Sequence, residues 1–480
     1  MTLVAFVTNV DGTIVIIGLP RLMSGLHISV TTGLWTLTSY IITSTVLLLP
    51  AGRWSDVVGS RRIFLSGLAV FTVATVGCGL AVSGGTLVAA RFVQGAGAAL
   101  AMATATPLIV RVFPGHELGR ALGINSTAWV MGSIVGPVVG GALVGAFGWR
   151  SIFFVTVPFA LAGVAGGLLF LPGGPGAGAR QRRAAASRER PDWGGLASFT
   201  CALVALLVAL SEGPPWGWTS WRVVGLLAAA AALVAFFGWW ELRLDHPLFD
   251  LRLLRHPHFR AGLGYTLSYA TGFFATTFLL TFYLQGALSL SPLEAGLVLV
   301  PLSAPQLVLA PIGGVLADRF GPARLVMGGT VLLVVSAYLL GEQGTTLSLR
   351  AVVVPLVIMS VGNSLLWPAL VKAVMSAAPS DRSGVAAGLF YTLRNVGMSL
   401  SLTLALVVVE ASLPGSMASR VFVGSAGVLP AREAGALAHS IDTGFRFFIA
   451  FYAIALLISL GLLAARRRAT EGAPAPEIGA

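Results

Sequence analysis

Long apolar runs separated by short polar stretches make up most of the chain. A helix needs about 20 apolar residues to cross a hydrocarbon core about 30 Å thick. Runs of this kind predict helices near residues 2–20, 33–54, 63–82, 85–112, 119–146, 149–171, 194–210, 219–240, 259–285, 292–317, 322–342, 348–376, 383–411 and 441–465. The pattern therefore predicts an all-α integral membrane protein with fourteen transmembrane helices.

The composition excludes a water-soluble protein. Of the 480 residues, 56% are hydrophobic and only 10% are charged, whereas soluble proteins carry roughly 25% charged residues. The two cysteines, Cys78 and Cys201, both lie inside apolar runs, so we expect no disulfide framework and no CxxC metal site. The six histidines fall in loops or at helix ends. We therefore expect no metal site and no cofactor.

Basic residues indicate how the chain is oriented. Thirty residues are Lys or Arg and the net charge is +12, but no basic stripe with interleaved aromatic residues suggests nucleic-acid binding. If the N-terminus is cytoplasmic, inner loops hold about three times as many basic residues as outer loops, as the positive-inside rule requires. We expect a multi-pass protein of the plasma membrane with both termini cytoplasmic. Lys372 is the only lysine, and this arginine bias indicates a GC-rich bacterial genome.

A loop sequence occurs twice. The stretch GRWSDVVGSRR from Gly52 recurs as GVLADRFGPAR from Gly314, with Asp, Gly and Arg at matching positions. Both copies fall between the second and third helices of a six-helix half. Duplicated halves around a central site are how many secondary transporters are built. The expected units are a six-helix half at 1–171, a linker with two inserted helices at 172–250, and a second six-helix half with a cytoplasmic tail at 251–480.

Four motifs occur in order in the first half: NVDGTIVIIGLP from Asn9, GRWSDVVGSRR from Gly52, RFVQGAG from Arg91 and GSIVGPVVGG from Gly132. Together they resemble the major facilitator superfamily, specifically its fourteen-span drug:proton antiporter branch, over essentially the whole chain. The resemblance implies the major facilitator fold with two inserted central helices. It also implies proton-coupled efflux of hydrophobic or cationic small molecules. The motifs depart from the family at Gly12 and Gly18, where other small residues are more usual.

Two residues are candidates for proton coupling. Asp11 is the only acid near mid-depth, about nine helical rises or roughly 13 Å into its helix, and an intramembrane acid is a functional-site hypothesis by default. Arg91 lies inside a span and stays charged, so it needs an aqueous cavity or a partner; by resemblance it helps relay the proton. Gln94, one turn on, can share its hydrogen bonds. The alternatives are a capped or paired structural Asp11 and an Arg91 bonded to backbone carbonyls.

Two further motifs are expected to control conformation. A cytoplasmic latch that favours one conformer and binds lipid phosphates would comprise Gly52, Asp56, Gly59, Arg61, Arg62, Asp318 and Arg324. A closely packed, bendable helix seam would comprise Gly132, Gly136, Pro137, Gly140 and Gly141. The alternatives are topology signalling for the loop and plain helix packing for the glycines.

Polar and aromatic residues inside spans are candidates for a substrate cavity, because aromatic faces bind apolar groups and cations. They are Asn9, Tyr40, Gln94, Asn125, Trp129, Tyr265, Tyr269, Gln306, Asn363, Trp367, Tyr391, Arg394 and Asn395. Residues of this kind are individually more often packing or lipid-interface positions, so we expect a minority to contact substrate. Glu294 and Glu410 lie near outer helix ends, and we expect no carboxylate deep in the last six helices. Dicationic substrates are therefore disfavoured.

Rival functions fit the sequence less well. A channel would need a filter loop, a membrane enzyme would need an acid pair or HExxH inside a span, and an ATP-driven pump would need GxxxxGK[ST]. None of these patterns occurs. We expect a monomeric transporter that contacts lipid, protons and a small substrate. Proton-coupled transport of an ordinary metabolite, such as an amino acid, a sugar or a lipid-like compound, remains the alternative function.

Overall fold

The computed structural model describes residues 2–112, 115–171, 192–244, 251–342, 349–377, 383–412 and 431–471. Helices occupy nearly all of these residues, and no β-strand occurs among them. The prediction of an all-α architecture is therefore confirmed.

The helices fall into two groups with a pair between them. The N-terminal bundle comprises α1 (Thr2–Leu26), α2 (Val30–Trp54), α3 (Ser60–Gly79), α4 (Gly84–Val112), α5 (Gly115–Phe147), α6 (Ser151–Phe154) and α7 (Thr156–Phe170). The inserted pair comprises α9 (Trp193–Trp216) and α10 (Trp221–Glu241). The C-terminal bundle comprises α11 (Pro257–Phe282), α12 (Pro292–Ser303), α13 (Gln306–Phe320), α14 (Pro322–Leu340), α15 (Leu349–Ser376), α16 (Ser383–Ser412) and α18 (Ala431–Glu471). Short turns of other helix types are η1 (Ser55–Gly59), η2 (Leu251–Arg255) and η3 (Tyr283–Ala287).

Length and composition support many membrane crossings. Twelve helical segments among the described residues are long and apolar enough to span a membrane. Two further long helices are α2, with 25 residues, and α9, with 24 residues; the apolar part of α9 is the shorter segment Gly194–Leu210. The chain is a multi-pass membrane protein, as the sequence predicts.

The last helix differs from its prediction. The expected helix at 441–465 is in fact α18, which begins at Ala431. Asp442 therefore lies well inside the helix instead of at its end, and only 5% of it is exposed. The expectation that the last six helices hold no deep carboxylate is wrong for this reason.

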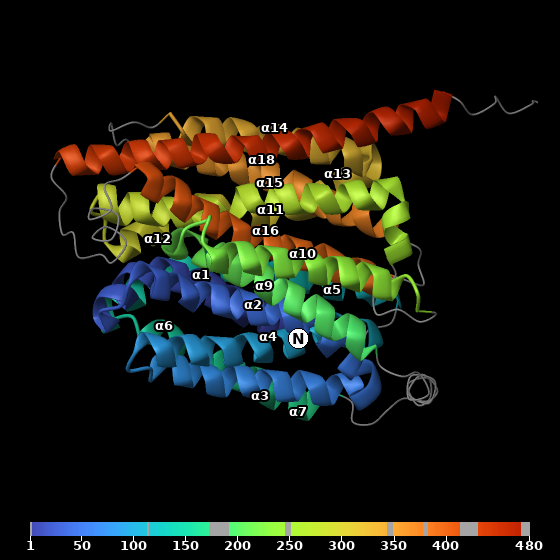
Figure 1. Ribbon diagram of the computed structural model, residues 1–480, viewed down its shortest axis with the longest axis horizontal. Helices are drawn as coiled ribbons and strands as arrows, with labels where there is room; N and C mark the ends of the chain where they lie inside the picture. The colour runs from blue at the N-terminus through green and yellow to red at the C-terminus, as the bar shows by residue number, and fades with distance from the viewer. Residues whose placement is uncertain are drawn as a thin grey trace, which may run out of the picture.

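The two bundles lie side by side along most of their length (Figure 1), and one continuous hydrophobic core runs through both. α9 lies across the junction, where α2 of one bundle and α16 of the other both contact it. Leu203 and Leu207 of α9 share a small apolar cluster with Ile42, Val46 and Val396. α10 packs against α9 at the periphery.

The glycine-rich α5 forms close contacts with both bundles. A Cβ atom at Gly132 would lie 2.8 Å from the backbone oxygen of Phe6 in α1, and one at Gly136 would clash with Thr13. On the next turns, Gly140 faces α1, whereas a side chain at Gly141 would clash with the backbone carbonyl of Pro292 in α12. Pro137 lies inside α5. The predicted seam is thus a line of tight helix contact that joins α1 to the opposite bundle through α5.

Candidate functional site

Four helices of the N-terminal bundle meet at a buried ion pair. Arg91 of α4 donates from Nη1 to Oδ2 of Asp11 in α1 at 2.6 Å and to Oε1 of Gln94 at 2.6 Å. Gln94 donates from Nε2 to Oδ1 of Asp11 at 2.9 Å. Asp11 is 0% and Arg91 1% exposed. The carboxylate therefore has a partner on each oxygen and is closed off from solvent.

Residues of α2 and α3 complete this ion-pair network. Arg91 Nε donates to the backbone oxygen of Thr36 at 2.9 Å, and the guanidinium lies 4.4 Å from the ring centroid of Tyr40. Thr75 Oγ1 accepts a second bond from Gln94 Nε2 at 2.8 Å, and the thiol of Cys78 approaches Gln94 Oε1 at 3.6 Å. The network thus fixes α1, α2 and α3 around the two polar side chains of α4.

Small residues bring these helices close enough for the network to form. A Cβ atom at Gly95 would lie 2.6 Å from the backbone oxygen of Tyr40, which places α4 against α2. A Cβ atom at Gly67 would lie 2.7 Å from the backbone nitrogen of Ala101, and one at Gly97 would clash with Phe71. These glycines let α3 and α4 approach closely, and Thr75 is thereby brought within reach of Gln94.

The ion-pair network pairs one acid, Asp11, with one arginine, Arg91. Arginine does not lose its proton in proteins. Removing one charge of a buried pair leaves the other uncompensated, which costs roughly 3–5 kcal/mol. The two charges of the network therefore depend on each other.

A second polar cluster lies in the C-terminal bundle. Tyr269 of α11 donates to Asn363 Oδ1 in α15 at 2.5 Å, and Asn363 Nδ2 donates to Gln306 Oε1 in α13 at 2.9 Å. Tyr265 stacks on Tyr269 with 6.5 Å between ring centroids and bonds Thr330 in α14 at 2.5 Å. Tyr265 is 1% exposed, so it packs between helices against Tyr269.

Arg394 of α16 projects toward the same cluster. Its guanidinium lies 4.9 Å from the ring centroid of Phe274 and 5.5 Å from that of Trp367. Its Nη1 donates a long bond of 3.3 Å to Oδ1 of Asn395. Trp367 also contacts Tyr269, with 5.9 Å between centroids. We call Phe274, Trp367, Arg394 and Asn395 the arginine–aromatic cluster.

The remaining sequence candidates take part in none of the hydrogen bonds given above for these two clusters. Asn9 donates to the backbone oxygen of Trp129 and so ties α1 to α5. Asn125 Oδ1 is buried without a hydrogen-bond partner among the described residues. Tyr391 is 40% exposed, the most open of the aromatic candidates. The structure thus brings together Asp11, Arg91, Gln94 and Tyr40 in one bundle, and Tyr269, Asn363, Trp367, Arg394 and Asn395 in the other.

The repeated loop is only partly described. Gly59 and Gly321 each precede a helix, α3 and α14, with positive φ values of 110° and 84° that favour glycine. Gly52 instead lies within α2. Arg61 Nη2 donates to the backbone oxygen of Leu168 at 2.8 Å. Arg62 and Arg324 are exposed, while the side chains of Asp56 and Asp318 lie outside the described residues.

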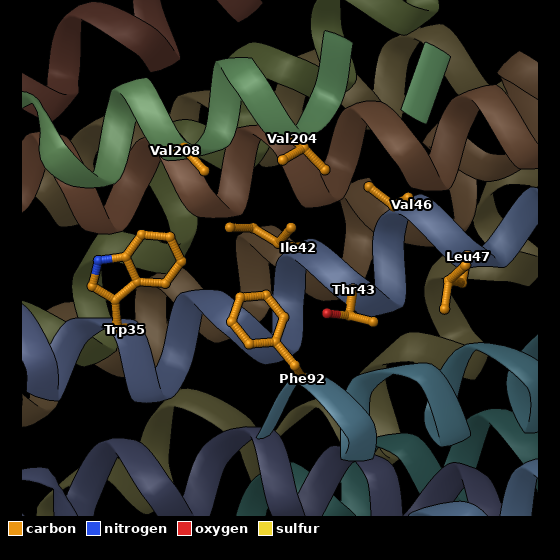
Figure 2. Close-up of a pocket in the computed structure, with 8 residues that line it drawn as sticks. All are labelled: Trp35, Ile42, Thr43, Val46, Leu47, Phe92, Val204 and Val208. Carbon is orange, nitrogen blue, oxygen red and sulfur yellow. The ribbon is translucent and has the colours of Figure 1, made fainter. Parts of the chain in front are cut away.

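A lateral cavity of about 260 Å³ lies between α2, α4 and α9. Figure 2 shows Val204 and Val208 of α9 facing Ile42 of α2, with Trp35 and Phe92 beside them. The lining carries no charged side chain. This largely apolar lining is suited to an apolar group.

Sequence reasoning missed several partners in these clusters. Thr75, Cys78 and Phe274 were not among the candidates, although each contacts a candidate side chain. A threonine on an apolar helix usually bonds its own backbone, as Thr75 also does to Phe71 at 2.7 Å. The sequence therefore carries no signal that separates Thr75 from its neighbours.

Comparison with known proteins gives consistent matches. The family model described as Major Facilitator Superfamily matches residues 1–402, and a second match covers residues 261–479. The tetracenomycin C resistance and export protein of Streptomyces glaucescens is 32% identical over 458 residues, which are 91% of this chain and 84% of that protein. The multidrug resistance protein Stp of Mycobacterium tuberculosis is 31% identical over 398 residues, covering 82% of this chain and 72% of that protein.

Solved structures share the fold. A bacterial homologue of the human lysosomal transporter Spinster, in an inward-facing and unoccupied conformation, superposes with a TM-score of 0.63 at 18% identity and covers 99% of this chain and 97% of its own. A D-xylose–proton symporter superposes with a TM-score of 0.62 at 16% identity, covering 96% and 94%.

Proposed function

The chain belongs to the Major Facilitator Superfamily, and on that premise we propose that it is a proton-driven exporter of hydrophobic, antibiotic-like small molecules. The similar proteins named for tetracenomycin C resistance and export and for multidrug resistance support the efflux function. The buried Asp11–Arg91–Gln94 arrangement carries the coupling to protons.

Proton coupling follows from the charge balance of the ion-pair network. With Asp11 ionised, the pair is neutral and closed to solvent. A proton that reaches Asp11 converts the carboxylate to a neutral acid and leaves Arg91 charged, and a charge inside the membrane needs water or a partner. The protonated state therefore favours a conformer in which Arg91 meets water, and the ionised state favours the closed network.

The position of Asp11 links this proton site to the movement of the bundles. Asp11 lies on α1, which packs on the glycines of α5, and α5 packs on α12 of the opposite bundle. Gln285 of η3 also donates to the backbone oxygen of Ile17 in α1 at 3.2 Å. A shift of α1 on protonation is thus transmitted directly to the contact between bundles, which is the contact that alternating access must change.

The same proposal includes the finer topology. We take α2 and α9 as spans, which gives fourteen helices in two six-helix halves, 1–171 and 251–480, with the segment 172–250 inserted between them. Both termini are cytoplasmic, the protein acts as a monomer in the bacterial plasma membrane, and Arg62 and Arg324 bind lipid phosphates at the cytoplasmic face. The paired turn glycines, Gly59 and Gly321, support the duplication.

Everted membrane vesicles test this function. Respiration acidifies their interior, and addition of an exported antibiotic or dye should release protons in proportion to its accumulation. Asp11→Asn should abolish proton release while downhill exchange of substrate continues. Asp442→Asn is the matched control, because it alters a buried carboxylate outside the ion-pair network and should retain coupling. Accumulation that persists after an uncoupler collapses the gradient would refute the proposal, and a response confined to metabolites would favour the alternative function.

A further inference from the structure

Arg394 carries a charge that no described carboxylate balances. Its described contacts are the rings of Phe274 and Trp367 and the Asn395 amide oxygen. No ion pair joins Arg394 to an acid among the described residues. An arginine inside a membrane is costly and normally faces a water-filled cavity or an anionic partner. The arginine–aromatic cluster therefore has one positive charge that can bind an anionic ligand.

Two buried acids, Asp11 and Asp442, do not balance the charge of Arg394. Both oxygens of Asp11 accept bonds from Arg91 and Gln94. Ser440, two residues before Asp442, donates to the backbone oxygen of Val409 in α16 at 3.0 Å. Val409 lies about 22 Å from Arg394 along that helix, which rises 1.5 Å per residue. Asp442 is therefore too distant to neutralise Arg394.

The guanidinium of Arg394 and the two rings beside it provide groups that suit the binding of a planar acid. A guanidinium has five N–H donors at the edge of a flat plane, and its faces stack on aromatic rings. The rings of Phe274 and Trp367 lie against it, and one described hydrogen bond, of 3.3 Å, uses its edge. The remaining edge donors suit a carboxylate, which arginine binds through two parallel bonds.

An exposed aromatic ring lies beside these donors. Tyr391 precedes Arg394 by one helical turn, so both residues share a face of α16. Tyr391 is the most exposed of the aromatic candidates, with 40% of the residue accessible. An acid bound to the guanidinium edge can therefore stack its own ring system on Tyr391.

We propose that Arg394 binds the acidic group of the transported compound, so that the protein selects planar aromatic compounds carrying a carboxylate or similarly ionised group. This proposal rests on the efflux function above and narrows its substrate class. It favours acidic over cationic substrates, because among the described residues Arg394 has no paired carboxylate, whereas Asp11 is held in a closed pair. The competing explanation is an arginine retained only for packing between α11, α15 and α16.

Binding of a matched pair of probes to the purified full-length protein tests the proposal. The probes are anthracene-9-carboxylate and the neutral anthracene-9-carboxamide, which share one ring system; quenching of tryptophan fluorescence reports both. The wild-type protein should bind the carboxylate at least tenfold more tightly than the amide. Arg394→Gln should remove this preference by weakening only the carboxylate, whereas Arg394→Lys should retain part of it, since the charge remains but the planar fork is lost.

The controls separate the two proposals. Arg446→Gln, which alters an exposed arginine paired with Glu342, should keep the full preference. Equal affinity of the wild-type protein for both probes, no binding of the carboxylate, or an unchanged preference in Arg394→Gln would each overturn the role of Arg394. If Arg394→Gln also loses binding of the amide, the preference for the carboxylate is measured in Arg394→Lys instead, which should retain part of it. Antibiotic efflux from everted vesicles is measured in parallel, so a failed probe preference with intact efflux overturns this inference alone.

Discussion

The two bundles each hold an arginine on aromatic rings inside the membrane, and the two differ in their counter-ion. Arg91 stacks on Tyr40 and is bonded to Asp11 and Gln94. Arg394 stacks on Phe274 and Trp367, and its one hydrogen bond among the described residues is a long bond to Asn395. The first arginine completes a neutral, closed network, and the second leaves its charge available.

Helix geometry explains part of this difference. Gln94 follows Arg91 by three positions, so both point to the same side of α4 and can share Asp11. Asn395 follows Arg394 directly, and adjacent residues of a helix do not face each other. The amide of Asn395 therefore reaches the guanidinium only at 3.3 Å. Arg91 is thus fixed by a partner one helical turn away. Arg394, whose partner is the next residue, keeps donors that a ligand can use.

The largest expected difference between Arg91 and Arg394 is in their contributions to the free energy of unfolding. Arg91→Gln should lower the free energy of unfolding by roughly 3–5 kcal/mol, because it leaves Asp11 buried without its counter-ion. Arg394→Gln is the matched control and should cost less than about 1 kcal/mol, because it removes a charge without stranding another. Thermal unfolding of the purified variants in detergent measures both, and equal losses would contradict the distinction.

A double-mutant cycle measures how strongly Asp11 and Arg91 depend on each other. Asp11→Asn and Arg91→Gln together should be less destabilising than the sum of the two single changes, with a coupling energy of about 2–3 kcal/mol, near the top of the range for contacting pairs. The same cycle on Arg446 and Glu342, an exposed pair, should give under about 1 kcal/mol. Additive effects at Asp11 and Arg91 would show that the ion pair is not a functional unit.

Asn395→Asp should give Arg394 a counter-ion, as Asp11 is for Arg91. The substitution converts the contact at 3.3 Å into an ion pair with almost no change in shape. Binding of anthracene-9-carboxylate should weaken about tenfold, or about 1.4 kcal/mol, because Arg394 then has a resident counter-ion. Asn395→Ala, which removes the amide without adding charge, should leave carboxylate binding nearly unchanged. Unaltered binding in Asn395→Asp would speak against an acidic ligand at Arg394.

The smallest expected effect concerns the support of Gln94. Thr75→Val removes the acceptor of one hydrogen bond from Gln94 and should cost about 1 kcal/mol of stability. Thr72→Val on the same helix is the control, because Thr72 bonds only its own helix, at 2.7 Å to Leu68. Thermal unfolding compares the two variants. Identical losses would mean that Thr75 acts only within α3.

The sequence predicts the helices well and singles out the residues of the buried ion pair. Apolar runs place nearly all the long helices, and Asp11, Arg91 and Gln94 are identified individually because polar groups inside spans are rare. The start of α18 is missed because Arg432, Glu433 and His439 interrupt the apolar pattern, although they continue the helix. Asp442 is therefore assigned to a helix end and its burial goes unnoticed.

Partnerships between helices are harder to predict. That Arg91 pairs with Asp11 depends on how α4 packs on α1 and α2, which the glycines of α3 and α4 determine through backbone contacts. Likewise, Phe274 and Trp367 reach Arg394 from α11 and α15. Neither ring differs in sequence from the many aromatic residues that face lipid. The chemistry of each site thus depends on contacts between residues far apart in the chain.

The position of α9 makes the molecule asymmetric about its own midline. Trp35 of α2 donates a hydrogen bond to Glu212 of α9, whereas the described contacts of α9 with α16 are apolar. When the bundles rock, we therefore expect α9 to travel with the N-terminal bundle as a lateral wall and α16 to slide along it. A covalent cross-link from α9 to α2 should leave transport running, and one from α9 to α16 should stop it.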